Sequence, residues 1–248
     1  MFGELYMKNR IIKIKDKYNS CFFKNDCDYL KYEYHNLVIN SIGKSTLGED
    51  IYCLRLGIGK KHLLLHAGFY ANESITSLIC MLWVEKFLAC LKKQELYKGY
   101  DLVELWDKVS IFIIPMANPD GINLVLGDKL TRLREEYYFI WKNYENNLEF
   151  WKSNIRGVNL MLNYPYSWEK YSFKLFKIGI VKPCPSVYPG PNCLSEVETK
   201  NIYNFIKFMD INKIISISTY GEKKQNIDAI YMLNKLDEYV LKYADNNI

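Results

Sequence analysis

The segment KHLLLHAG, residues 61–68, constrains the fold more than any other part of the chain. Its three leucines are consecutive instead of alternating with polar residues, which is the pattern of a strand buried on both faces of a sheet. Apolar residues at the spacing of one helical face follow it: Ile75, Leu78, Ile79 and Leu82. The segment therefore predicts a strand followed by a helix, and we expect Asn72 to cap that helix with Glu73 in its first turn.

The rest of the chain also predicts strands that alternate with helices. Short apolar runs predict further strands at residues 37–43, 51–57, 109–115, 156–162 and 213–218. Ser195 and Glu198 form the S-x-x-E pattern of a capped helix start, and apolar residues with helical spacing predict a last helix around 230–241. Together they predict an α/β fold with a mixed, mostly parallel sheet and helices on both of its faces.

The remaining segments are connections. NPDG, residues 118–121, is typical of a turn. Residues 183–192 hold four of the seven prolines and predict a loop. Residues 1–35 are polar, basic and rich in tyrosine, and we interpret them as an irregular or helical lead-in to one domain at 36–248. A chain of 248 residues is long enough to bury a core of ordinary size.

Composition excludes several classes of protein. The formal charge is +5, but the lysines are scattered, so we expect no nucleic-acid partner. No apolar run approaches 18 residues, so we expect no membrane partner, and the first residues lack a signal-peptide core. The seven cysteines form no C-x-x-C motif and three lie in apolar segments, which favours a reducing compartment and a cytoplasmic location.

Three predicted strands end in polar segments: HAGFYANE, NPDG and STYGE (218–222). Because the carboxyl ends of parallel strands meet at one edge of a sheet, we expect these segments to converge on a functional site.

The motifs resemble the zinc carboxypeptidases, the carboxypeptidase A-like metallopeptidases, and most of all the bacterial members that cut γ-D-glutamyl-diaminopimelate bonds in cell-wall peptides. The resemblance rests on segments in the family's order: INSIGKSTLGEDIYCLRLGIGKK, FYANESITS, IPMANPDGINLV, WKSNIRGVNLMLNYPYSWE, YPGPNCLSEVETK and STYGE. They cover roughly residues 36 to 222. The resemblance implies a carboxypeptidase A-like fold.

The resemblance also implies a zinc ion held by a His-x-x-Glu motif and a later His, which leaves an open position for water. That motif falls on residues 70–73, so Glu73 is retained whereas Tyr70 replaces the first His. The second His position is Ser218. Phenol and serine hydroxyls are poor zinc ligands at neutral pH, so the implied metal set is reduced to one carboxylate.

Other implied positions have changed as well. The family's substrate-binding Asn-Arg pair falls on Met161 and Leu162, and Lys152 stands where an arginine stabilises the oxyanion. The general-base glutamate lies on a later strand, and only 30 residues follow Ser218. We therefore expect a domain that is shortened at its C-terminus, in which Glu222 does not match the position of the base.

Each remaining group also has a purely structural interpretation. His66 is a candidate substitute ligand, but a single histidine at a strand end is more often a packed side chain. Glu73 could simply be a carboxylate at a helix N-terminus, and Lys152 a solvated lysine. Met161 and Leu162 could be core residues.

Two functional hypotheses follow. The first is a non-catalytic family member without a cofactor that binds peptides of the cell-wall type or a protein partner. The alternative is an active zinc peptidase with a rebuilt ligand set that uses Glu73, His66 and one more group. A third interpretation, an incomplete gene product, predicts poorly cooperative unfolding.

Overall fold

The structure is a computed structural model that describes residues 11–128, 130, 134–219 and 229–245. Its elements follow one another in this order: α2 (Ser20–Glu33), β1 (Val38–Lys44), β2 (Asp50–Leu56), β3 (Lys61–His66), α3 (Ser74–Lys93), α4 (Leu102–Lys108), β4 (Val109–Ile114), α5 (Pro119–Leu126), α6 (Glu135–Trp141), η1 (Lys142–Phe150), η2 (Leu160–Leu162), α7 (Trp168–Lys177), α8 (Val197–Phe208), β5 (Lys213–Ser216) and α9 (Ala229–Asp245). Strands and helices alternate through much of the chain, as the sequence predicts.

The five strands of the described residues form one mixed sheet in the order β1-β2-β4-β3-β5. Strand β2 runs antiparallel to both β1 and β4, whereas β3 runs parallel to β4 and to β5. The predicted mixed sheet is therefore confirmed, with its parallel pairings gathered around β3. This places the carboxyl ends of β4, β3 and β5 side by side.

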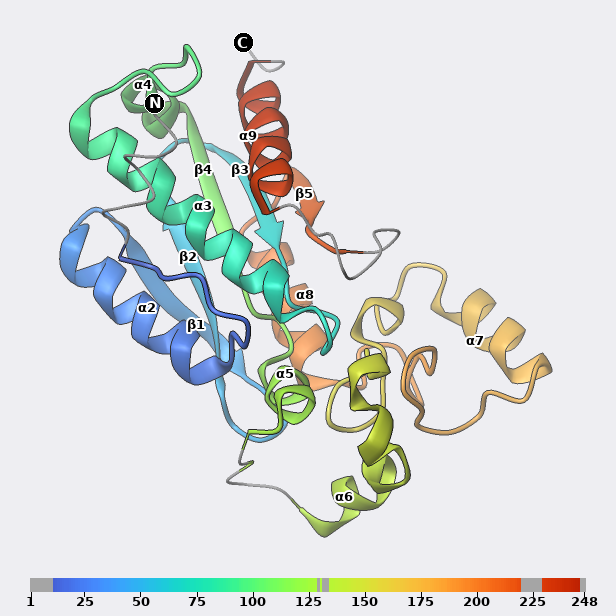
Figure 1. Ribbon diagram of the computed structural model, residues 1–248. Helices are drawn as coiled ribbons and strands as arrows, with labels where there is room; N and C mark the ends of the chain where they lie inside the picture. Colours follow the sequence, from blue (N-terminus) through green and yellow to red (C-terminus); the bar gives the residue numbers. More distant parts are fainter. Residues whose placement is uncertain (1–10, 129, 131–133, 220–228, 246–248) are drawn as a thin grey trace.

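Helices cover both faces of the sheet (Figure 1). Helices α2, α3 and α9 pack on one face, and α8 packs on the other. In β3, Leu63 and Leu65 join the core on the α3 side, while Leu64 between them joins the core on the α8 side. Burial on both faces explains why the leucines are consecutive.

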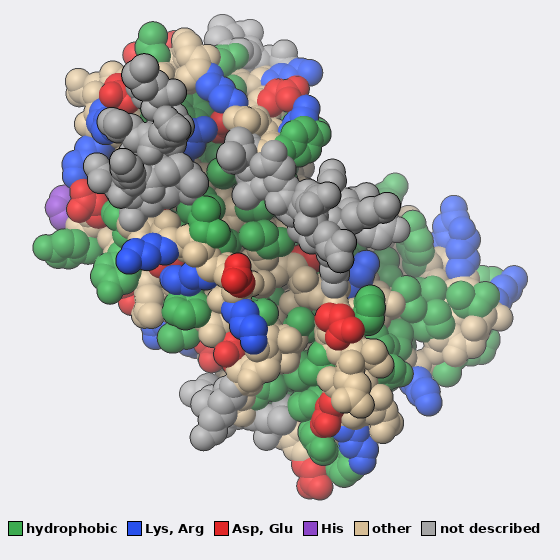
Figure 2. All heavy atoms as spheres, in the orientation of Figure 1, with side chains coloured by type: hydrophobic (Ala, Val, Ile, Leu, Met, Phe, Trp, Pro, Cys, Tyr) green, Lys and Arg blue, Asp and Glu red, His purple; other side chains and the backbone are tan. Residues whose placement is uncertain are grey.

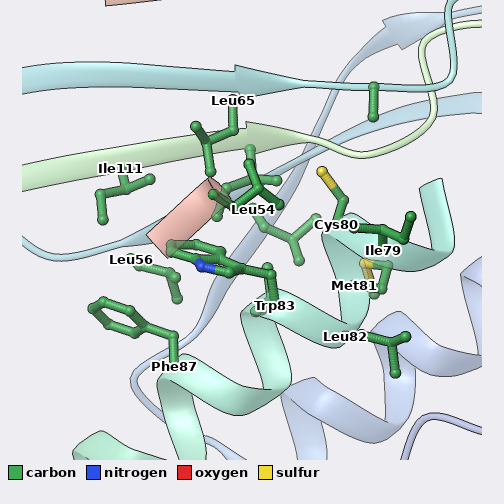
Figure 3. Packing of buried hydrophobic residues seen from close by; sticks show 14 of the residues in the cluster. Leu54, Leu56, Leu65, Ile79, Cys80, Met81, Leu82, Trp83, Phe87 and Ile111 are labelled. Carbon is green, nitrogen blue, oxygen red and sulfur yellow. The ribbon is translucent and has the colours of Figure 1, made fainter. Parts of the chain in front are cut away.

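The larger core lies between the sheet and α3 (Figure 3). Trp83 and Phe87, one turn apart on α3, point toward Leu56 and Ile111 of the sheet. Both aromatic side chains are almost completely buried, at 1% exposure each. Burying side chains of this size contributes on the order of 2–3 kcal/mol apiece, so α3 is fixed against the sheet.

Helix α3 is a long, apolar helix. Its 20 residues are long and apolar enough to cross a membrane by length and composition alone, although no such segment was expected. In the fold, 67% of its most apolar stretch is buried inside the protein. The core helix of a globular domain meets the same criterion, and α3 is placed as one.

Two predicted helix caps are wrong. Helix α3 has Glu73 as its N-cap, with no side-chain capping bond, and the Asn72 amide instead donates to the carbonyl of Glu149. Helix α8 has Glu196 as its N-cap, also without a side-chain bond. Its predicted partner Glu198 reaches Thr46 instead. In each case a contact distant in sequence replaces the local one.

Two other segments also differ from expectation. NPDG is the start of helix α5, because the Asn118 side chain accepts a hydrogen bond from the amide of Gly121 at 3.1 Å. Residues 156–162 form turns and the short helix η2 instead of a strand. The Asn154 side chain accepts bonds from the amides of Arg156 and Val158, both at 3.0 Å, and this folds the segment back on itself.

The ends of the described chain belong to the same core. The lead-in contains α2, whose Phe23 and Leu30 are buried in the cluster that also includes α3. The last predicted helix is confirmed as α9, with Leu233 and Leu236 buried. The proline-rich segment 183–192 is a loop, as predicted. The boundary at residue 36 stays a prediction.

Candidate functional site at the strand ends

The segments that follow β3, β4 and β5 are joined to one another by backbone hydrogen bonds. The amide of Asn118 donates to the carbonyl of Gly68 at 2.9 Å, and the amide of Ile217 donates to the carbonyl of His66 at 2.9 Å. Gly68 has φ +64°, and a Cβ there would lie 2.5 Å from the Ser77 hydroxyl. The turn that leads the chain from β3 toward Glu73 therefore needs glycine.

Glu73 is the carboxylate at the centre of this edge. It is 5% exposed, and its Oε2 accepts hydrogen bonds from the Ser218 hydroxyl and from the Thr219 amide, both at 3.0 Å. These donors follow β5, about 145 residues further along the chain. The structure thus brings together Glu73 and Ser218, two positions at which the resemblance implies metal ligands.

Tyr70 and Lys152 lie next to each other. The Lys152 ammonium is 5.3 Å from the centroid of the Tyr70 ring, within the range of a cation–π contact. The backbone holds the two segments together, because the amide of Ala71 donates to the carbonyl of Lys152 at 3.2 Å. Lys152, where the resemblance implies an arginine, therefore lies next to Tyr70, where it implies a histidine.

Met161 and Leu162 occupy the short helix η2, and both are half-buried. The Asn159 side chain begins this helix by accepting a bond from the amide of Met161 at 3.0 Å. Met161 packs against the apolar cluster on the α8 side of the sheet. Where the resemblance implies a polar substrate-binding pair, this chain thus has two apolar side chains, one of which extends the core.

His66 has contacts with Ser216 and Phe69. Its Nε2 is hydrogen-bonded to the Ser216 hydroxyl on the neighbouring strand, and its ring contacts Phe69 edge-on, with the centroids 4.5 Å apart. Burial lowers its pKa to about 4, so the imidazole is neutral at physiological pH. Its polar partner is Ser216, which matches the packed interpretation of this side chain.

The groups at this edge do not fit a zinc ion. Within the described ranges, no cluster of three or more His, Cys, Asp or Glu side chains could hold a metal. The Glu73 carboxylate already accepts two internal hydrogen bonds, and the hydroxyls of Tyr70 and Ser218 are poor zinc donors at neutral pH. Tyr220 and Glu222 of the STYGE motif lie outside the described residues.

The sequence interpretation missed a set of buried carboxylates beside the site. Asp120 accepts bonds from the Ser45 hydroxyl at 2.9 Å and the Leu47 amide at 2.7 Å, and Glu198 accepts two bonds from Thr46 at 2.8 Å. Burial, with the nearby charge of Glu198, raises the pKa of Asp120 to about 7. These carboxylates fix the loop between β1 and β2 to α5 and α8, and nothing local in the sequence indicates this pairing.

The fold is that of known metallocarboxypeptidases. The solved thrombin activatable fibrinolysis inhibitor matches with a TM-score of 0.61 at 18% identity, covering 88% of this chain and 53% of that one. A carboxypeptidase A from Helicoverpa armigera matches with a TM-score of 0.60 at 19% identity, over 82% of this chain and 46% of that one. At this level of identity the likeness shows the fold alone.

The sequence comparisons give the family. The zinc carboxypeptidase family model matches residues 24–225. Among curated relatives, the γ-D-glutamyl-L-diamino acid endopeptidase 1 of Lysinibacillus sphaericus is 28% identical over 86% of this chain and 53% of its own length. The protein YqgT of Bacillus subtilis is 30% identical, over 73% and 48%. The chain belongs to the zinc carboxypeptidase family, and it spans about half the length of these relatives.

Proposed function

We propose that this chain is a non-catalytic member of the zinc carboxypeptidase family that binds peptides at the strand-end site. One observation carries the proposal. The retained ligand, Glu73, accepts hydrogen bonds from the Ser218 hydroxyl and the Thr219 amide. The carboxylate is thereby satisfied inside the fold by the residue that stands where the resemblance implies a metal-binding imidazole.

The remaining polar groups suit peptide binding better than hydrolysis. Lys152 offers a cation beside the aromatic ring of Tyr70, and an ammonium is a good partner for a peptide carboxylate. One relative is named for acting on γ-D-glutamyl-L-diamino acid bonds. We therefore take peptides that contain this linkage as the ligand class, and we propose no step through a metal.

The cysteines support a reducing compartment such as the cytoplasm as part of this proposal. All seven are free thiols in the structure, and burial raises the pKa of Cys53 to about 12, which keeps that thiol protonated and unreactive. Free thiols in this number persist best where the surroundings are reducing.

Metal content tests the loss of the zinc site. We expect the purified protein to hold less than about a tenth of a zinc ion per chain after exposure to zinc and a brief wash. The variant Tyr70→His/Ser218→His restores two imidazoles beside Glu73 and should take up close to one zinc per chain. Its failure to gain zinc, with folding intact, would mean that the three positions do not share one site.

The same measurement tests the active alternative. Stoichiometric zinc in the parent protein, together with hydrolysis of a γ-D-glutamyl-diamino acid peptide, would overturn the proposal. If His66 and Glu73 were then ligands, His66→Ala and Glu73→Gln would each release the zinc. His35→Ala, at an exposed histidine, is the matched control and should change nothing.

Peptide titration tests the binding function. We expect saturable binding of a γ-D-glutamyl-diamino acid peptide, weakened about tenfold or more in Lys152→Ala, since a charge-assisted hydrogen bond contributes about 1.5–3 kcal/mol. Lys152→Arg keeps the charge and should retain most of the affinity. Lys31→Ala, at an exposed lysine on α2, is the control. No saturation at millimolar peptide would refute binding.

A further inference from the structure

Helix α7 projects from the body of the protein (Figure 1). None of its ten residues is buried. Its side-chain anchor to the body is Trp168, whose indole N–H donates to the carbonyl of Pro189 at 3.1 Å, while Leu175, two turns further on, is half-buried. The opposite side of α7 is therefore presented to the surroundings.

Part of that exposed surface is apolar. Phe173 and Phe176 are 59% and 65% exposed, and residues three apart on a helix share one face. The segment that follows adds Ile178 and Val181, at 72% and 56%. Contiguous exposed apolar patches are rare on protein surfaces, and they commonly mark sites that bind a protein or a membrane.

Lysines border the apolar side. They are all exposed: Lys170, Lys174, Lys177 and Lys182. Glu169 is the one acidic residue within 166–182. This short segment therefore carries four positive charges and one negative charge, a net +3. None of the four lysines forms an ion pair within the described chain. Figure 2 shows hydrophobic side chains across this projection with lysines around its rim.

We propose that α7 and residues 178–182 bind the surface of an anionic lipid bilayer. Helices with aromatic residues on one side and lysines beside them lie in the interface between headgroups and acyl chains, and each lysine near an anionic surface strengthens binding by about fivefold. The expectation of no membrane partner rested on the absence of a spanning run. This helix lies along the surface and needs no span.

The charge pattern argues against the other occupants. In a symmetric contact between two copies, the same patch faces itself, which would place the net +3 of one copy opposite the +3 of the other. Bases of a nucleic acid could stack on the rings of Phe173 and Phe176, but this would leave the aliphatic Ile178 and Val181 exposed. An anionic bilayer satisfies both the apolar side and the lysines at once.

Co-sedimentation of the whole chain with vesicles tests the proposal. We expect binding to phosphatidylcholine vesicles that contain phosphatidylserine, and little binding to phosphatidylcholine alone. Phe173→Ser/Phe176→Ser should weaken binding by about tenfold or more through lost apolar burial. Lys170→Gln/Lys174→Gln/Lys177→Gln should remove the preference for phosphatidylserine. The control Lys207→Gln/Phe208→Ser alters an even more exposed Phe-Lys pair on α8 and should bind as the parent does.

Several outcomes would overturn the proposal. Equal binding to both kinds of vesicle would do so, as would an equal loss in the control variant or no loss in the Phe variant. Sedimentation of the protein alone distinguishes self-association: a dimer that Phe173→Ser/Phe176→Ser dissociates would assign the patch to a second copy. Circular dichroism of each variant should match the parent, because α7 contributes no buried residue.

Discussion

The buried imidazole of His66 makes stability depend on pH. Its pKa falls from 6.5 to about 4 in the fold because burial disfavours the charged ring. Between those values the unfolded chain binds a proton that the folded chain does not, so stability falls as pH drops. We expect His66 to account for a loss of about 2 kcal/mol between pH 7 and pH 5.

Urea unfolding at the two pH values measures this effect. His66→Gln keeps an amide able to bond Ser216 but cannot titrate, so it should lose about 2 kcal/mol less than the parent on acidification. His35→Gln, at an exposed histidine, should behave as the parent. The idea fails if the parent and His66→Gln lose the same stability.

Asp120 should act in the opposite direction. Its pKa rises from 3.8 to about 7 because of burial and the nearby Glu198. Across that window the folded chain binds a proton that the unfolded chain has released, so stability falls as pH rises. Asp120→Asn should remove this decline, and its stability should then rise more steeply than the parent's from pH 5 to pH 7. An unchanged slope in denaturation curves would contradict the assignment.

The contrast between Asn72 and Glu73 shows which features local sequence rules can predict. Asparagine before a helical pattern is a good cap, and the start of α3 was predicted within a residue or two. The donors that satisfy Glu73, on Ser218 and Thr219, are about 145 residues away. A rule based on neighbours three or four positions apart cannot anticipate them. Only the resemblance to a family paired these positions.

At the scale of elements, one carboxylate joins α9 to α3. Asp237 is fully buried, and its Oδ1 accepts bonds from the Trp83 indole at 2.9 Å and from the Tyr97 hydroxyl. Its Oδ2 lies 3.0 Å from the ammonium groups of both Lys86 and Lys98. A single side chain of α9 thus bonds to α3 and to the segment that follows it.

Removing this carboxylate should destabilise the protein by about 3 kcal/mol. Asp237→Ala leaves the buried donors of Trp83 and Tyr97 without an acceptor, at about 1–3 kcal/mol each. Lys235→Ala breaks the exposed pair with Glu238 on the same helix and should lower the unfolding midpoint far less, because solvent screens such pairs. Equal midpoints for the two variants in urea would show that the buried contact adds no stability.

The elements that the sequence predicted well are those whose pattern comes from burial. Strands β3 and β4 are continuous apolar runs because both of their faces are covered. Residues 156–162 have comparable apolar content, yet they form no strand. The side chains of Asn154 and Asn159 accept hydrogen bonds from backbone amides there. In a strand, the carbonyls of a neighbouring strand would accept such bonds. Composition does not distinguish a backbone amide that bonds to a side chain from one that bonds within a sheet.

At the scale of the whole molecule, segments from both ends of the described chain share one core. The lead-in helix α2 and the last helix α9 both pack into the cluster that covers one face of the sheet. The sequence-based interpretation as an incomplete gene product predicts gradual unfolding. A shared core predicts a single transition, with circular dichroism and tryptophan fluorescence giving the same midpoint.

Deletion of α9 tests that shared core. The helix buries four large apolar side chains: Leu233, Leu236, Val240 and Leu241. Their burial contributes on the order of 6–12 kcal/mol, which is similar to the whole stability of an ordinary domain. A chain without residues 229–248 should therefore lose its cooperative transition and bind an apolar dye through the uncovered surface of α3. If the shortened chain unfolds as sharply as the parent, the core is stable without α9 and this prediction is wrong.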